Sequence, residues 1–199
     1  MWEERAYRAR RDITALAAGG LGVSDLHAAA IRLIEAKVGT DLTCWATIDP
    51  ENLVISTMTS GDSRIPWEYE PWLAEAEYTA NEPHTFATLA LRKTTTAKLT
   101  DLPNRDRHRS VRINNVWRPL GVDQELRVMF LADGACWGAA GMVRAGSDFS
   151  DRETDFLAAV APSPSPTRLG WRCAPRQAAR SRAATQPSLS SVQAANFGR

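Results

Sequence analysis

The sequence predicts an α+β fold, in which helices pack against one antiparallel β-sheet, followed by a disordered C-terminal tail. Two observations indicate this. Segments with the apolar spacing of helices and strands follow one another in the order helix, helix, hairpin, helix, helix, hairpin, helix, which is typical of a mixed fold with a single sheet. After residue 161 this periodicity stops. We therefore expect a domain at 1–161 and a tail at 162–199.

Two helices are expected at the N-terminal end of the domain. Residues 2–18 carry apolar side chains at helical spacing. Gly19 and Gly20 then end this helix, because glycine readily takes the left-handed conformation found at helix ends. The second helix is expected to begin at Ser24, a good N-cap residue, and to run to about Val38.

A first β-hairpin follows. Residues 42–48 alternate in the manner of a strand, with Cys44 and Ala46 on one face. The turn-forming residues 49–52 separate this strand from a returning strand at about 53–58.

The middle of the chain is less regular. Helices are expected over 67–80 and about 107–118, and the stretch between them can be read as a helical turn or as a short strand.

A second hairpin and a final helix close the domain. Residues 125–132 give the strongest strand pattern of the chain, the turn sequence Asp133-Gly134 follows, and 137–144 is the partner strand. Ser150 and Glu153 then fit the S-x-x-E capping box, which predicts a helix starting at residue 151.

The net charge of +1 hides a division within the chain. Residues 1–161 hold 18 lysines and arginines against 23 acidic residues, a net charge of −5, whereas residues 162–199 hold six arginines and no acidic residue. The second segment also contains five of the 11 prolines. Such a segment buries too little apolar surface to offset the entropy of ordering, so we expect disorder. One hypothesis is that the reading frame shifts near codon 162 and that the tail is an out-of-frame product.

Three motifs together resemble a known family. They are Trp117-Arg-Pro-Leu-Gly-Val-Asp-Gln-Glu-Leu-Arg-Val-Met-Phe130, Asp133-Gly-Ala-Cys-Trp-Gly138 and Phe149-Ser-Asp-Arg-Glu153. In this order they resemble the GAF-type sensory domain of LuxR-family, helix-turn-helix transcriptional regulators from high-GC bacteria, over roughly residues 1–161. The resemblance implies a six-stranded antiparallel sheet with a sensory pocket over it. It also implies a helix-turn-helix domain near the C-terminus, and the residues after Pro162 show no such pattern.

The resemblance therefore predicts a ligand- or partner-sensing module that is truncated before its DNA-binding domain. The alternative is a stand-alone interaction module that dimerises with intact regulators and modulates them. A small thiol-dependent enzyme on the same fold is the third possibility, which the absence of closely grouped cysteines disfavours. The sequence shows no Ser/His/Asp set, phosphate loop or carboxylate pair in a recognisable context, so we expect no catalysis.

The expected partners follow from the same observations. They are a small apolar ligand or a protein, in a homo- or heterodimer, with no sequence-specific DNA binding by this chain and no membrane. We expect no cofactor and no metal, because His27, His84 and His108 lack ligands at suitable spacing. Three widely spaced cysteines and the absence of an apolar leader indicate a cytoplasmic protein.

A ligand site is expected between the sheet and the helices of residues 67–120. A mixture of large aromatic and small side chains can leave a void there, and the chain contains seven tryptophans. The alternative is a fully packed core. The candidate lining residues are Cys44, Ala46, Val128 and Phe130 on strands and Trp72 and Trp117 on helices.

Overall fold

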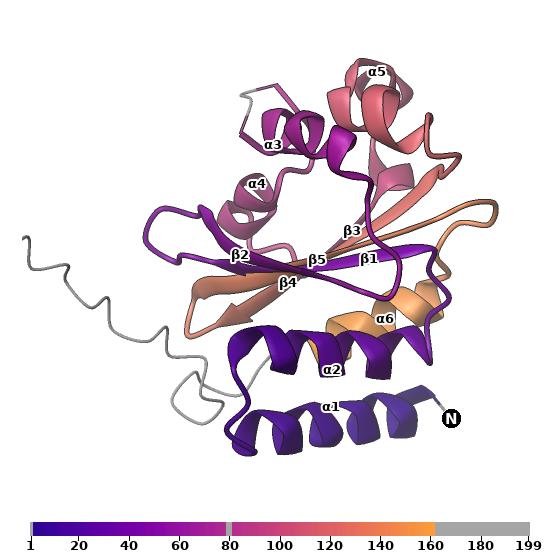
Figure 1. The fold of residues 1–199 in the computed structure, drawn as a ribbon. Helices are drawn as coiled ribbons and strands as arrows, with labels where there is room; N and C mark the ends of the chain where they lie inside the picture. Colours follow the sequence, from indigo (N-terminus) through magenta and orange to yellow (C-terminus); the bar gives the residue numbers. More distant parts are fainter. Residues whose placement is uncertain (1, 79–80, 162–199) are drawn as a thin grey trace, which may run out of the picture.

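The fold consists of one antiparallel sheet with a layer of helices on each face (Figure 1). It is given by a computed structural model, which describes residues 2–78 and 81–161. The predicted α+β class is confirmed. The predictions made for residues 162–199, disorder and a shifted reading frame, lie outside the described residues.

The sheet has five strands among the described residues, where the family resemblance implied six. All neighbouring strands are antiparallel. In sheet order the strands are β2 (Ile55–Ser60), β1 (Leu42–Ile48), β5 (Ala135–Arg144), β4 (Gln124–Ala132) and β3 (Thr96–Lys98). Both expected hairpins are present, β1–β2 and β4–β5. Asp133 and Gly134 have φ values of 53° and 79°, which suits the tight turn between β4 and β5.

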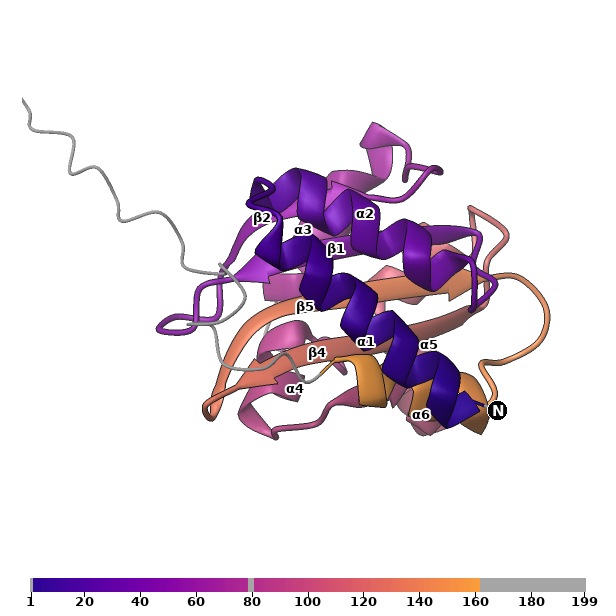
Figure 2. The ribbon, with the colours of Figure 1, turned by 90° about the horizontal axis from the view of Figure 1, so that it is seen from below.

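Three helices cover one face of the sheet (Figures 1 and 2). They are α1 (Trp2–Ala18), α2 (Val23–Glu35) and α6 (Asp151–Val160). Their apolar faces meet the sheet in a closely packed core that includes Ile34, Trp45, Met142 and Phe156. The helix over 2–18 is confirmed. The N-cap of α2 is Gly22 and not Ser24, and α2 ends at Glu35, three residues before the expected end.

Shorter helical segments cover the other face (Figure 1). They are η1 (Trp67–Tyr69), α3 (Glu70–Tyr78), α4 (Phe86–Leu91), η2 (Leu99–Asp101), α5 (Asn104–Arg109) and the π-helical turn η3 (Ile113–Trp117). The ambiguous region between the expected helices thus contains both a helix, α4, and a strand, β3. The helix expected over 107–118 is divided in two, because Ser110 is extended (ψ 122°). The Ser110 hydroxyl donates a hydrogen bond to Glu82.

The N-terminus of α6 has the predicted capping box. The Ser150 hydroxyl accepts a hydrogen bond from the Glu153 amide at 3.3 Å, and Glu153 accepts one from the Ser150 amide at 2.8 Å. Arg144 on β5 adds two bonds to the same carboxylate, at 2.9 and 3.0 Å. The hydrogen bonds from Arg144 and Ser150 lower the pKa of Glu153 to about 2.

No helix of the described residues is long and apolar enough to cross a membrane.

Candidate ligand-binding cavity

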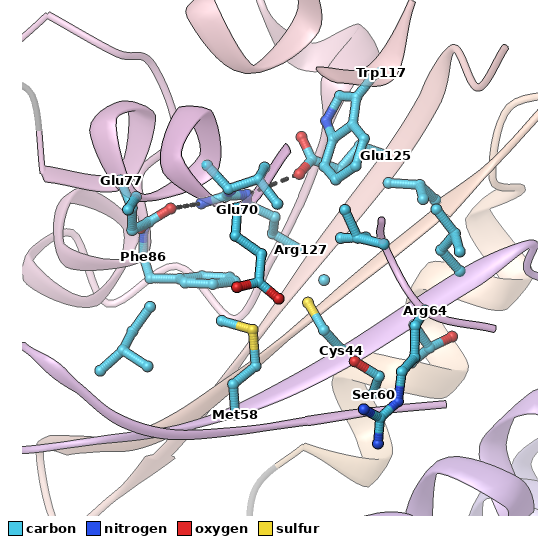
Figure 3. A pocket seen from close by; sticks show the side chains of 18 of the residues that line it. Cys44, Met58, Ser60, Arg64, Glu70, Glu77, Phe86, Trp117, Glu125 and Arg127 are labelled. Carbon is cyan, nitrogen blue, oxygen red and sulfur yellow. Dashed lines mark hydrogen bonds and ion pairs between the residues drawn. The ribbon is translucent and has the colours of Figure 1, made fainter. Parts of the chain in front are cut away.

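A cavity of about 380 Å³ lies between the sheet and the layer that contains α3, α4 and η3 (Figure 3). Its position follows from the packing on that face, where two hydrophobic clusters form side by side. One cluster gathers around Phe86 and Met129, and the other around Trp117 and Val143. The cavity borders both of them. Its volume falls within the usual range of small-molecule sites.

The floor of the cavity consists of two rows of residues that follow the strand register. One row is Leu42, Val143 and Glu125, and the other is Ser60, Cys44, Gly141 and Arg127. Gly141, at the centre of the second row, has no side chain that would project from the floor into the cavity. A Cβ at this position would lie 3.3 Å from the Cys44 Sγ and 3.8 Å from the Phe86 ring, with no third atom within 4 Å. A larger side chain at Gly141 would therefore grow into the cavity.

The walls are mostly apolar. Phe86 comes from α4, Leu73 from α3 and Trp117 from η3, and Met58 on β2 closes one side. Largely apolar walls with a few placed polar groups are the common form of a small-molecule site.

A buried arginine forms the charged end of the floor. The side chain of Arg127 is 5% exposed and lies with its guanidinium 4.2 Å from the centre of the Phe86 ring. Its Nε donates to Glu125 at 3.1 Å, and its Nη1 donates to Glu77 at 2.8 Å and to the His84 carbonyl at 2.9 Å. His84 has a φ of 55°, a conformation that non-glycine residues adopt rarely and that often marks functional regions.

A second buried arginine extends this network below the helical layer. Arg112 donates through Nε to Glu125 at 3.0 Å and through Nη1 to Glu82 at 3.2 Å. Glu82 also accepts the amide of Val111 at 2.8 Å. The resulting ionic cluster comprises Glu77, Glu82, Arg112, Glu125 and Arg127. It carries three negative charges and two positive charges, so its formal net charge is −1.

Two members of the ionic cluster, Glu125 and Arg127, are held in their charged forms by their neighbours. Burial alone would raise the pKa of Glu125, but the guanidinium groups of Arg112 and Arg127 bring that pKa below its usual value. Burial alone would lower the pKa of Arg127, and Glu77 and Glu125 raise it instead. Glu125 and Arg127 are therefore ionised at neutral pH.

Two charged side chains mark the mouth of the cavity. Glu70 on α3 and Arg64 in the loop before it are both exposed and line the opening. The Glu70 carboxylate points into the cavity (Figure 3). Neither side chain forms a hydrogen bond or an ion pair with any residue that the structure describes.

Of the six candidate lining residues that the sequence suggested, the structure places two in the cavity lining and four outside it. Cys44 and Trp117 line the cavity. Ala46 is buried on the same face but lies one row further along, beside Met58 and Ala139, and does not line it. Trp72 is 44% exposed on α3 and also lies outside the lining.

Val128 and Phe130 face the opposite layer of helices, which corrects the expected placement. Both belong to the core of α1, α2 and α6, where Phe130 packs on Trp45 with ring centres 4.7 Å apart. The register explains the error: Cys44 pairs with Gly141 and Gly141 with Arg127, so the odd-numbered residues of this part of β4 face the cavity. The gap beside Val128 and Phe130 measures only about 10 Å³, the size of one water molecule at most.

The sequence reasoning missed the charged residues of the site. Glu125 and Arg127 are two positions apart on β4 and therefore lie on one face. Two charged residues on one face of the most apolar strand were a signal for a buried charged site. Glu77 and Glu82 gave no comparable signal, because they join the site only through tertiary contacts.

Comparisons with known proteins define the fold. The sequence matches no protein-family model and no curated protein. Among solved structures, the chain is similar to the phycocyanobilin-bound GAF domain of a cyanobacterial phytochrome, with a TM-score of 0.55 at 14% identity over 82% of this chain and 91% of that one. A phycoerythrobilin-bound GAF domain from a cyanobacterial phytochrome gives a TM-score of 0.52 at 14% identity, over 82% and 91%.

A third similar structure is the GAF domain of an Acinetobacter phosphoenolpyruvate-protein phosphotransferase. Its TM-score is 0.51 at 11% identity, over 83% of this chain and 90% of that one. These similarities show that the chain has a GAF-like fold, as its motifs suggested.

Proposed function

We propose that this protein is a sensory module that binds a small, mostly apolar molecule in the cavity between the sheet and the layer of α3, α4 and η3. The cavity itself carries the proposal. Small-molecule sites are typically concave, largely apolar and lined by a few placed polar groups. The cavity has this form, with a volume of about 380 Å³ and an opening beside Arg64 and Glu70. A small ligand can therefore enter it and bury its apolar surface against the walls.

The proposal also concerns the kind of regulator with which the module acts. The motifs at 117–130, 133–138 and 149–153 support a module that acts in the cytoplasm with a LuxR-type transcriptional regulator. Reading of DNA sequence would belong to another module or chain. The phycocyanobilin- and phycoerythrobilin-bound structures support the ligand-binding part, because those GAF domains hold small organic molecules.

The chemistry of the cavity supports binding over catalysis. Cys44 is the thiol on the floor, and burial raises its pKa to about 11. A thiol acts as a nucleophile in its ionised form, and this one stays protonated at neutral pH. The buried carboxylates at the cavity, Glu125 on the floor and Glu77 in the cover, are held in ion pairs with arginines.

A ligand screen combined with a cavity-filling variant tests this function. Small apolar molecules that bind should raise the melting temperature and quench the fluorescence of Trp117, which borders the cavity. The double variant Cys44→Ala/Gly141→Leu should abolish both effects, because the leucine grows into the space and the alanine relieves its closest contact.

Two controls make the result specific. Cys44→Ala alone should retain binding. Gly22→Leu introduces the same side chain at an open position at the start of α2, in the opposite layer, and should also retain it. Binding that survives in the filled double variant would contradict the proposed site.

A further inference from the structure

The buried floor of the cavity holds an unused hydrogen-bond donor on Arg127. Arg127 uses Nε and both hydrogens of Nη1 for Glu125, Glu77 and the His84 carbonyl. Its Nη2 donates to no residue that the structure describes, yet this atom is not sealed from solvent. Since Arg127 lines the cavity and its side chain is only 5% exposed, the cavity is the place where Nη2 can meet an acceptor.

Trp117 contributes an apolar surface to the same site. Its side chain lines the cavity, and its indole Nε1 is buried away from solvent, so this donor is not offered to a ligand. Donors in protein interiors are normally satisfied, so the unused Nη2 of Arg127 calls for an acceptor. A ligand that carries a hydrogen-bond acceptor would supply it.

The surrounding charges exclude an anionic acceptor. The ionic cluster has a formal net charge of −1, and Glu77 and Glu125 reach the cavity from it. Glu70 adds a further unpaired carboxylate that points into the cavity, whereas the guanidinium of Arg64, the other charge at the mouth, lies away from Arg127 (Figure 3). A carboxylate on the ligand would meet these three in a site of reduced dielectric, where repulsion between like charges is strong.

A cationic ligand is also disfavoured at this point. An ammonium group beside Arg127 would face the guanidinium charge and would leave its Nη2 hydrogens without an acceptor. The remaining chemistry is an uncharged acceptor.

We propose, building on the ligand-binding function above, that the cavity selects an uncharged, largely apolar molecule that presents a carbonyl-type oxygen to Arg127 Nη2. The apolar body would lie against Phe86, Leu73 and Trp117, and the oxygen would lie at the arginine end of the floor (Figure 3).

Three probes with one aromatic body test this selection: 2-acetylnaphthalene, 2-naphthoate and 2-naphthylmethylamine. They present a ketone, a carboxylate and an ammonium group at the same position. Titrations of the full chain, followed by ligand-observed NMR, should show the ketone binding at least about tenfold more tightly than the other two. The double variant Cys44→Ala/Gly141→Leu should abolish its binding.

Two variants test the groups that make the selection. Arg127→Lys keeps the positive charge but removes Nη2, and should weaken ketone binding by about tenfold. Because Arg127 is part of the ionic cluster, this variant needs a check of its melting curve. Glu70→Gln avoids that difficulty, since Glu70 is exposed and outside the cluster. It should strengthen 2-naphthoate binding and narrow the difference in affinity between the ketone and 2-naphthoate several-fold.

The outcomes distinguish a wrong ligand class from a wrong ligand-binding function. If naphthoate or the amine binds most tightly, and the filled double variant abolishes that binding, the ligand class is wrong and the ligand-binding function stands. Unchanged naphthoate affinity in Glu70→Gln overturns the exclusion of anions. If none of the three probes binds, the ligand class is overturned and the ligand-binding function loses its support.

Discussion

Glu125 is the residue on which the ionic cluster depends, because its carboxylate accepts from both Arg112 and Arg127. Glu77 and Glu82, which belong to the layer that covers the cavity, form ion pairs with Arg127 and Arg112 respectively. The ion pairs therefore join the floor and the cover of the cavity. A pair of this kind contributes little net stability when whole, but removal of one partner leaves an uncompensated buried charge.

Glu125→Ala should therefore be strongly destabilising. It leaves two buried arginines with reduced compensation, and we expect a loss of about 3–5 kcal/mol in the free energy of unfolding. Urea denaturation at pH 7 measures this loss. Glu51→Ala, at an exposed position in the β1–β2 turn, is the control and should change stability by less than about 0.5 kcal/mol. A loss for Glu125→Ala as small as that of the control would show that the cluster is not formed.

His27 should make stability depend on pH. It is fully buried beside Trp45, and burial lowers its pKa to about 4. Between that value and the unfolded value of about 6.5, the unfolded chain binds a proton that the folded chain does not. Stability is thus full above pH 6.5 and falls as the pH drops. From pH 7.5 to pH 5 we expect a loss of about 2 kcal/mol.

Denaturation curves at several pH values for the wild type and His27→Leu measure this effect. The quantity to compare is the slope of the unfolding free energy against pH, since the variant also changes the baseline stability. Equal slopes between pH 5 and 7 in the two proteins would mean that His27 titrates normally.

At the scale of elements, α6 illustrates how one carboxylate fixes a helix. Glu153 closes the capping box with Ser150 and receives Arg144 from β5, so it joins the helix start to the sheet. We expect Glu153→Ala to cost about 1–2 kcal/mol, through the lost cap and the broken ion pair. Asp155→Ala, exposed on the same helix, is the matched control.

The lowered pKa of Glu153 gives this prediction a pH signature. The carboxylate contributes stability above its unfolded pKa of about 4.5 and loses the contribution as the pH falls toward 2. The difference in unfolding free energy between wild type and Glu153→Ala should therefore shrink over that interval. Acid titration followed by circular dichroism measures it, and a difference that stays constant down to pH 2 would argue against the Arg144 pair.

The sequence predicted the elements with strong local signals. Both hairpins and the capped α6 are present as alternation, turn residues and the capping box indicated, although β2 starts two residues later and β5 two residues earlier than expected. The region 83–118 could not be predicted in the same way, since its short segments depend on distant partners. Ser110 interrupts one helix because it binds Glu82, which is 28 positions away.

The face assignment of β4 failed for a related reason. Helices cover both sides of this strand, so residues 125–130 are all buried and the alternation of burial disappears. Because neither face of β4 is exposed to solvent, no alternation of polar and apolar residues showed which face would border the cavity. Arg127 and Glu125 reach it because the ionic cluster compensates their charges there.

At the scale of the whole molecule, the two faces of the sheet differ in packing. Ile34 on α2 is buried in the closely packed layer, and Ile34→Ala should cost about 2–5 kcal/mol. Leu73 on α3 borders the cavity, so Leu73→Ala should cost less, under about 2 kcal/mol. Denaturation of both variants, with titration of a bound ligand, should show unchanged affinity for the first and reduced affinity for the second. The reverse pattern would mean that the packed face holds the site.

The ionic attachment of the cover has a consequence for how this protein can diverge. The packed layer of α1, α2 and α6 meets the sheet in one hydrophobic cluster, while the helices above the cavity meet it through two smaller hydrophobic clusters and through the ionic cluster of five charged side chains. Substitutions among the apolar wall residues can then alter which molecule is recognised at small cost to folding. We expect the specificity of such a module to change readily during evolution, as long as its charged framework is inherited intact.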